Sequence, residues 1–251
     1  MGDWRTLHLF DKTKYLHEIV PKVRALENYL TVFLNDKHLS YLKWFNTPIE
    51  EIIKKTIKLV SELDDELSCH PEMIKLSQIP NKNYENCYLH VESFIRQTQP
   101  SIEFFEYLII ETIFTYVADF NPYFVMGKRI FEGAIETREY SIARELTSKI
   151  RSQNKGSILD VIDGGIINWL SKEEVKLLYF DKDSISPSND ESFEYVIEFK
   201  ELLKYASENN LGLISLRNPR EYELCHLNIN TNGFQNVVKN GNYKYLIIRD
   251  K

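Results

Sequence analysis

IEFFEYLIIETIFTYVADF, residues 102–120, is the stretch that decides the fold class. Its apolar residues fall on every side of a helix, which is typical of a helix inside a large soluble core or in a membrane. A membrane span needs about 18 to 20 apolar residues with few charges. Acids near the bilayer centre cost roughly 2.5–3.5 kcal/mol each, and four interrupt this stretch: Glu103, Glu106, Glu111 and Asp119. The stretch therefore predicts a buried helix within a helical globule, and no membrane contact.

The composition is that of an ordinary soluble domain, with 43% hydrophobic and 27% charged residues in a chain of 251. The three cysteines are an odd number, so a complete intramolecular disulfide framework is excluded. No apolar run follows Met1, because Asp3, Arg5 and Asp11 interrupt the region where a signal peptide would lie. Both observations predict a cytoplasmic protein in a reducing compartment.

Several start signals predict further helices. Thr47-Pro48-Ile49-Glu50 and Ser171-Lys172-Glu173-Glu174 both have the pattern of a capping box. Asn121-Pro122 predicts the start of a helix through residue 135, and residues 131–150 predict two helices folded back on each other. The spacing of apolar residues in 192–209 predicts another helix, which ends at Gly212. Its predicted buried face carries Phe193, Val196, Ile197, Leu203 and Ala206.

The last part of the chain has a different pattern. Four segments are typical of strands: 213–216 (LISL), 222–230 (YELCHLNIN), 234–238 (FQNVV) and 243–249 (YKYLIIR). Asn-Gly turns separate them at 232–233 and 240–241. We therefore predict a mainly α fold, a multi-helix globular bundle with a small C-terminal α+β element that contains a short antiparallel β-meander. The predicted domains are 1–180, which is helical, and 181–251, which packs on it.

One segment resembles a nuclease motif. Tyr195-Val196-Ile197-Glu198-Phe199-Lys200 is similar to the strand that carries the Glu-x-Lys half of PD-(D/E)xK nucleases. The resemblance implies that Glu198 and an upstream acid, Asp181 or Asp183, hold a divalent metal while Lys200 helps to activate water. Hard Mg²⁺ prefers such oxygen ligands. The helix predicted over 192–209 competes with this interpretation, because Glu198 and Lys200 would point about 200° apart on a helix.

Other candidate sites have weaker patterns. Zinc needs three or four converging thiolate or imidazole ligands, and one possible set is Cys69, His70, Cys87 and His90. Buried cysteines are more often small apolar residues, so we predict no metal and no cofactor. The segment 160–165 (DVIDGG) favours a helix break over a phosphate turn, since no phosphate-binding motif surrounds it. Arg217, Arg220 and Tyr222 fit an ordinary loop, with a phosphate contact as the alternative.

The charge distribution gives the functional hypothesis. Residues 61–120 hold three Lys or Arg against eleven Asp or Glu, a net charge of −8, while the whole chain carries −6. An acidic region favours a basic protein partner and disfavours nucleic acid. We therefore predict a non-catalytic protein-binding protein, of the kind that bacterial immunity proteins or antitoxins represent, with a basic toxin as its partner. A helical scaffold or regulatory protein is the alternative, beside the nuclease. The predicted partner-binding residues are Glu62, Asp64, Asp65, Glu66 and Glu72.

Overall fold

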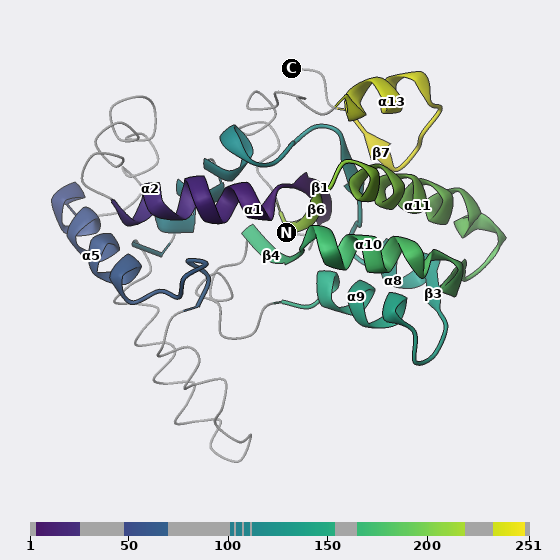
Figure 1. The fold of residues 1–251 in the computed structure, drawn as a ribbon, viewed down its shortest axis with the longest axis horizontal. Helices are drawn as coiled ribbons and strands as arrows, with labels where there is room; N and C mark the ends of the chain where they lie inside the picture. The colour runs from purple at the N-terminus through teal and green to yellow at the C-terminus, as the bar shows by residue number, and fades with distance from the viewer. Residues whose placement is uncertain are drawn as a thin grey trace, which may run out of the picture. The chain divides into compact units, whose positions relative to one another are not determined.

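A computed structural model describes residues 4–25, 48–69, 101–102, 104–106, 108–110, 112–153, 165–218 and 233–248 (Figure 1). The chain divides into two compact units. The first contains Met1–Thr13, Ile113–Gln153 and Asp163–Lys251, and the second contains Lys14–Thr112 and Asn154–Ile162. The domain boundary predicted near residue 181 is a statement about which segments fold independently. It stays a prediction.

The strands of the first unit are β1 (Arg5–Phe10), β2 (Tyr123–Val125), β3 (Ile135–Thr137), β4 (Gly165–Leu170), β5 (Ile185–Pro187), β6 (Gly212–Arg217) and β7 (Leu246–Ile247). Its helices are α1 (Lys12–Lys14, at its edge), α8 (Ile130–Ala134), α9 (Ile142–Arg151), α10 (Lys172–Phe180), α11 (Phe193–Glu208) and α13 (Phe234–Asn240). Short 3₁₀ turns lie at Lys182–Ser184 and Asp190–Ser192. The second unit contains a π-helical turn at Tyr15–Ile19, α2 (Val20–Arg24) and α5 (Ile49–Ser61).

A five-stranded antiparallel sheet in the order β4-β6-β1-β2-β7 forms the centre of the first unit. A second sheet pairs β3 with β5. The prediction of a mainly α bundle with only a small β element is therefore wrong. Two of the three long strands, β1 and β4, escaped prediction because almost every residue in them is buried. Strand β4 (GIINWL) is buried on both faces and shows no alternation of polar and apolar residues. In β1 the polar residues Thr6 and His8 are buried as well, so the strand has no exposed face.

The predicted C-terminal β-meander is also wrong. Residues 213–216 do form a strand, but β6 lies between β4 and β1 and not beside the segments that follow it. Residues 234–240 form α13, whose buried Phe234 and Val238 are four residues apart, as on one face of a helix. Of the described residues 243–248 in the predicted strand at 243–249, only Leu246–Ile247 form a strand, which pairs with β2. The segment 222–230 lies outside the described residues.

The predictions were more accurate for helices with a clear start signal in the sequence. Both α10 and α11 are present, and Ser171 and Glu174 form the predicted capping box. Helix α5 begins at Ile49 with Pro48 as its N-cap, and Thr47 lies outside the described residues. The long helix is present at 101–102, 104–106, 108–110 and 112–116, and its described residues are mostly buried, as predicted. The helix predicted after Asn121-Pro122 is wrong, because residues 123–125 form β2. In the segment 131–150, where two helices were predicted, the helical residues are those of α8 and α9.

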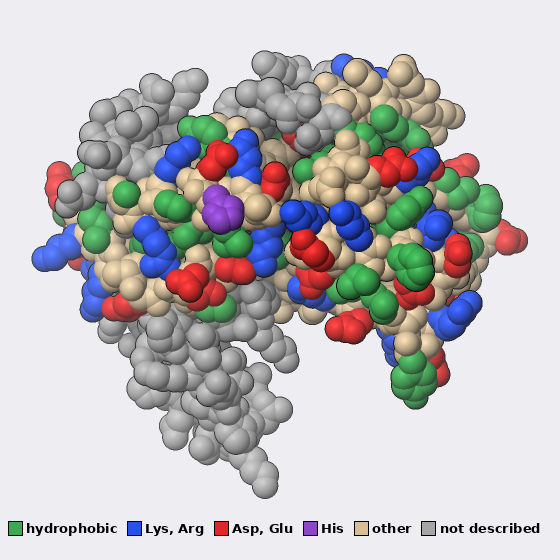
Figure 2. Space-filling model, in the orientation of Figure 1, with side chains coloured by type: hydrophobic (Ala, Val, Ile, Leu, Met, Phe, Trp, Pro, Cys, Tyr) green, Lys and Arg blue, Asp and Glu red, His purple; other side chains and the backbone are tan. Residues whose placement is uncertain are grey.

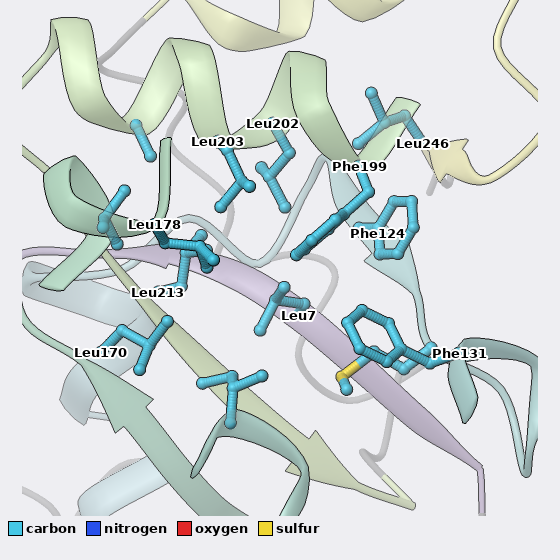
Figure 3. Close-up of a cluster of buried hydrophobic side chains, with 14 of the residues drawn as sticks. Leu7, Phe124, Phe131, Leu170, Leu178, Phe199, Leu202, Leu203, Leu213 and Leu246 are labelled. Carbon is cyan, nitrogen blue, oxygen red and sulfur yellow. The ribbon is translucent and has the colours of Figure 1, made fainter. Parts of the chain in front are cut away.

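The main hydrophobic core lies between one face of the five-stranded sheet and the helices α9, α10 and α11 (Figure 1). Figure 3 shows Leu7 of β1 and Leu213 of β6 pointing toward side chains of the helices. Each fully buried Leu or Phe contributes roughly 1.5–3 kcal/mol relative to an exposed one. The labelled side chains of α10 and α11 in this close-up are Leu178, Phe199, Leu202 and Leu203.

Side chains of the sheet satisfy the last carbonyl groups of α9. Arg5 Nη1 donates to Arg151 O at 2.9 Å, and Ser215 Oγ donates to Ile150 O at 2.8 Å. Asn168 Nδ2 donates to Lys149 O and Ser152 O, each at 3.0 Å. The end of a helix leaves four carbonyls without intrahelical partners, and these bonds from β1, β4 and β6 fix the helix end against the sheet.

Candidate functional site

The acidic residues predicted to bind a partner lie in a turn that follows α5. We call residues 62–69 the acidic turn. Its centre is Asp64, whose Oδ1 accepts from Ser68 N at 2.7 Å and whose Oδ2 accepts from Ser68 Oγ at 3.0 Å. Leu67 has a φ of 60°, which closes the turn in the left-handed region. Asp64 therefore organises the turn through its own hydrogen bonds, which is a structural reason for an acid at the end of a helix.

Two side chains from earlier in the second unit fasten this turn. Tyr15 Oη donates to Glu66 O at 2.7 Å, and Arg24 Nη2 donates to Leu63 O at 3.3 Å and to Asp64 O. Burial, followed by the carboxylates of Asp64 and Glu66, raises the pKa of the Tyr15 hydroxyl. The tyrosine therefore keeps its proton and remains a donor. These bonds hold the backbone of the acidic turn in one conformation.

The carboxylates of the acidic turn differ in exposure. Glu62 and Asp65 are exposed, whereas Asp64 and Glu66 are half-buried. Arg24 Nη2 lies 4.0 Å from Asp65 Oδ1, and the Asp65 side chain is fully exposed. Exposed pairs of this kind contribute about 0–1 kcal/mol, so Arg24 adds little through this contact. Glu72 lies outside the described residues, and the role of all five residues in partner binding stays a prediction.

The residues of the nuclease resemblance do not form a metal site. Residues 193–208 are helical, as periodicity predicted, and the strand that the motif needs is not formed. Glu198 is only 4% exposed and accepts three backbone N–H bonds, from Lys244 at 2.7 Å, Tyr245 at 2.6 Å and Leu246 at 2.8 Å. This carboxylate therefore fixes the segment that contains β7, and it does not face a substrate.

The two acids upstream of Glu198 in the nuclease resemblance are Asp181 and Asp183. Asp181 Oδ1 accepts from Ser184 Oγ, and its Oδ2 accepts from Ala143 N at 2.8 Å in the first turn of α9. The hydrogen bond from Ser184, and then that from Ala143, hold the pKa of Asp181 below its usual value. Asp183 is exposed, and burial lowers the pKa of Lys200. Asp181 thus joins the end of α10 to the start of α9.

The zinc and glycine-turn candidates lie largely beyond the described residues. Cys69 is described and half-buried, and burial raises the pKa of its thiol. His70, Cys87 and His90 lie outside the described ranges, as does the segment 154–164. Among the residues that the structure does describe, no group of three or more His, Cys, Asp or Glu is placed to hold a metal ion.

A histidine in the sheet has a strongly lowered pKa. His8 of β1 is fully buried, and its ring packs against Phe114, Phe120 and Tyr123 with centroids 5.0 to 5.7 Å apart. Its Nδ1 lies 3.0 Å from Phe120 O, and its Nε2 lies 2.8 Å from Thr6 Oγ1. Because a carbonyl only accepts, Nδ1 carries the proton and Nε2 accepts from the Thr6 hydroxyl. Burial lowers the pKa of His8 to about 3. His8 is therefore a neutral, internally bonded core residue.

Sequence reasoning missed one exposed feature of the first unit. Leu177 and Phe180 of α10 are 49% and 86% exposed, and Phe193 and Ile197 of α11 are 58% and 43% exposed. Figure 2 shows hydrophobic side chains at the surface over these two helices. The prediction placed Phe193 and Ile197 on the buried face of the helix, but α11 buries Tyr195 and Glu198 instead. We call Leu177, Phe180, Phe193 and Ile197 the apolar face.

Comparison with known proteins found no similar protein. No family model, curated protein or solved structure matches this chain. In the part of the chain that the structure describes, none of the helices has the length and apolar character that crossing a bilayer requires.

Proposed function

We propose that this chain is a non-catalytic protein-binding protein that engages a basic protein partner through the acidic turn. The observation that carries the proposal is the acidic turn itself, in which the side chains of Glu62 and Asp65 are exposed on a backbone that Asp64, Tyr15 and Arg24 hold in place. A surface that is already ordered loses little conformational entropy on binding. Fixed charges also steer a partner of opposite charge and raise its association rate.

The apolar face of α10 and α11 supports protein binding in general. Exposed apolar residues that gather on neighbouring helices mark interaction sites more often than single exposed residues do. Phe180 alone is 86% exposed, and covering it would stabilise a complex by roughly 1.5–3 kcal/mol. The apolar face and the acidic turn belong to different units, and each is an independent candidate surface.

The more specific version is an inhibitor of the kind that immunity proteins and antitoxins represent. Such a protein acts by occluding its target, and its binding surface needs complementary shape and charge but no catalytic group. The described candidates for catalysis, Asp181 and Glu198, are engaged in internal hydrogen bonds, which agrees with this version. A helical scaffold that binds through the apolar face is the second candidate, and it is favoured by the exposure of Phe180 and Phe193.

Charge reversal at the acidic turn separates these two versions. We expect a basic protein to be captured by the wild-type chain and lost when Glu62 and Asp65 are both replaced by lysine. Asp64 stays unchanged in this variant, because its hydrogen bonds with Ser68 are needed for the turn. The association rate of the wild-type complex should fall as salt is raised across the range in which exposed charges are screened.

The matched control reverses two exposed acids at the other end of the same helix, Glu50 and Glu51. This variant has the same change in net charge and should retain the partner. Equal capture by the Glu62→Lys/Asp65→Lys variant would contradict binding through the acidic turn. Loss of capture on replacing Phe180 and Phe193 by serine, with the acidic turn intact, would favour the scaffold.

A further inference from the structure

The helices α10 and α11 pack along each other in opposite directions (Figure 1). Near one end of the pair, Lys176 Nζ of α10 donates to Asn210 Oδ1, just after the end of α11, at 2.6 Å. Toward the other end, Asp183, which follows α10, acts electrostatically on Lys200 in the middle of α11. The last turn of α10 and the first half of α11 therefore lie at the same end of the helix pair, and this end carries the apolar face.

The apolar face has the area of a binding site. An aromatic side chain presents about 150–250 Å² when it is fully exposed, so the exposed fractions of the four residues amount to roughly 400 Å². The largest apolar patch on an ordinary monomer measures about 300–600 Å² and is often functional. A specific interface buries about 800 Å² on each partner, of which about 56–65% is apolar. The apolar face therefore supplies most of the apolar area that one side of such an interface needs.

The segment that joins α10 to α11 is acidic. We call residues 181–192 the acidic connection, which holds four acids and one cation, a net charge of −3. The cation is Lys182, which is half-buried, with its Nζ 4.7 Å from the centre of the Tyr179 ring. Phe180 directly precedes the acidic connection and Phe193 directly follows it. The two most exposed residues of the apolar face therefore flank an acidic surface. The exposed acids of the acidic connection are Asp183, Asp190 and Glu191.

Hydrogen bonds hold the backbone of the acidic connection. Its strand β5 pairs with β3, and Ser188 N donates to Ala134 O at 3.1 Å. Asn189 Oδ1 accepts from Ser192 N at 3.0 Å and from Ser192 Oγ at 2.8 Å, directly before the start of α11. A surface whose backbone is fixed in this way loses little conformational entropy when a partner binds.

Charge and shape together specify the kind of partner. Glu194, exposed and three residues before Ile197 in α11, adds a further acid beside the apolar face. A second copy of this chain would bring the same acids against this surface, and like charges oppose association. A basic partner complements it. The apolar residues lie on two neighbouring helices, and a third helix packs on such a pair at an axial distance of about 8–10 Å through an apolar stripe of its own.

We propose that the apolar face, with the acidic connection beside it, docks a basic amphipathic helix of a partner protein. The apolar stripe of that helix covers Phe180 and Phe193, and its lysines or arginines lie against Asp190 and Glu191. The acidic turn belongs to the other unit, so this proposal does not rest on binding there.

The test measures fluorescence anisotropy of a labelled peptide titrated with the full chain. The probe is a peptide of about 18 leucines and lysines whose leucines recur at helical spacing, and the reference peptide has the same composition in an order that breaks this spacing. We expect saturable binding of the probe and at least about ten-fold weaker binding of the reference.

Two variants remove the two parts of the surface. Phe180→Ser/Phe193→Ser should weaken binding of the probe by about ten-fold or more, as expected for aromatic anchors of an interface. Asp190→Lys/Glu191→Lys should weaken it several-fold and reduce its dependence on salt. The matched controls are Ile57→Ser in α5 and Val237→Ser in α13, which remove apolar residues that are 40% and 39% exposed. Single exposed apolar residues are ordinary, so both controls should bind the probe within about two-fold of wild type.

Equal affinity for the probe and the reference peptide, or equal affinity in wild type and Phe180→Ser/Phe193→Ser, would overturn the proposal. Probe binding that is lost in Glu62→Lys/Asp65→Lys and kept in the serine variant would overturn it in favour of the acidic turn. A dimer of the wild-type chain in sedimentation velocity that the serine variant lacks would overturn it in favour of a second copy. If the serine variant does not fold, Asp190→Lys/Glu191→Lys decides, because both of these residues are exposed.

Discussion

Glu198→Gln is expected to lower the free energy of unfolding by about 2 kcal/mol, since it removes the charge from a buried carboxylate that three backbone N–H groups contact. Oε2 accepts from Tyr245 N and Leu246 N, and Oε1 accepts from Lys244 N. A glutamine of the same shape can place its oxygen at the Oε2 position and keep two of these bonds. Its NH₂ group then faces the Lys244 N–H group, so two hydrogen-bond donors meet and the Lys244 N–H group loses its acceptor.

The magnitude follows from these three bonds. A hydrogen bond to a charged acceptor contributes about 1.5–3 kcal/mol and a neutral one about 0.5–1.5 kcal/mol. The variant loses one charged bond and converts two others to neutral bonds. A neutral amide also costs less to bury than a carboxylate, which offsets part of the loss. These opposing effects leave a net destabilisation of about 2 kcal/mol.

Urea unfolding and amide hydrogen exchange measure this effect together. A loss of 2 kcal/mol corresponds to roughly thirty-fold faster exchange if the amides open by the same transition. The amides to follow are those of Lys244, Tyr245 and Leu246. The control is Glu201→Gln, which makes the same charge change at a half-buried position of the same helix. Stability within about 0.5 kcal/mol of wild type, with unchanged exchange at these amides, would refute the role assigned to Glu198.

Two further substitutions test other parts of the first unit. Burial lowers the pKa of His8 to about 3, so below pH 6.5 the unfolded chain takes up a proton that the folded chain does not. Stability should therefore fall by up to about 1.4 kcal/mol per pH unit from pH 6.5 toward pH 3. Urea titrations at pH 7 and pH 5 should show a loss about 2 kcal/mol larger in wild type than in His8→Asn, and identical pH dependence would contradict a buried neutral His8. Asn168→Asp places a carboxylate against Lys149 O and Ser152 O, where Asn168 Nδ2 now donates; thermal unfolding at neutral pH should show a loss of about 2–4 kcal/mol, and an unchanged midpoint would contradict this contact.

Local signals predicted helices well but missed most of the sheet. Helix α10 was predictable because Ser171 and Glu174 form a capping box from adjacent residues. Strand β1 was not, since Thr6 and His8 are as completely buried as Leu7 on the opposite face. A polar residue in such a strand looks like a surface residue in the sequence, and only its partner, here Phe120 O for His8, shows why it is buried.

The candidate sites depended on long-range contacts to different degrees. The acidic turn was predictable as a charged surface, because its acids are consecutive in the sequence. The structural role of Asp64 was not, since it depends on the backbone that places Ser68 against it. In α11, residue type predicts that Phe193 is buried and that Glu198 is exposed. Glu198 is nevertheless buried, because three backbone N–H groups donate hydrogen bonds to its carboxylate. The sequence pointed to Arg217 as a candidate phosphate contact, but its pairing with Arg5 has no sequence signal, because β1 and β6 meet only in the sheet.

The position of β1 inside the sheet also affects how the protein is made. Trp4 and Asn218, which flank the paired strands, are 214 residues apart and exchange hydrogen bonds. A ribosome that adds about 5–20 residues per second needs roughly 10–40 seconds between the two. For most of that time Leu7 and Leu9 have neither β6 nor the helices α10 and α11 to cover them, because α10 begins only at Lys172. Strand β1 thus waits for elements that are made much later, and a nascent chain stalled before residue 172 exposes apolar side chains of β1 that chaperones can bind.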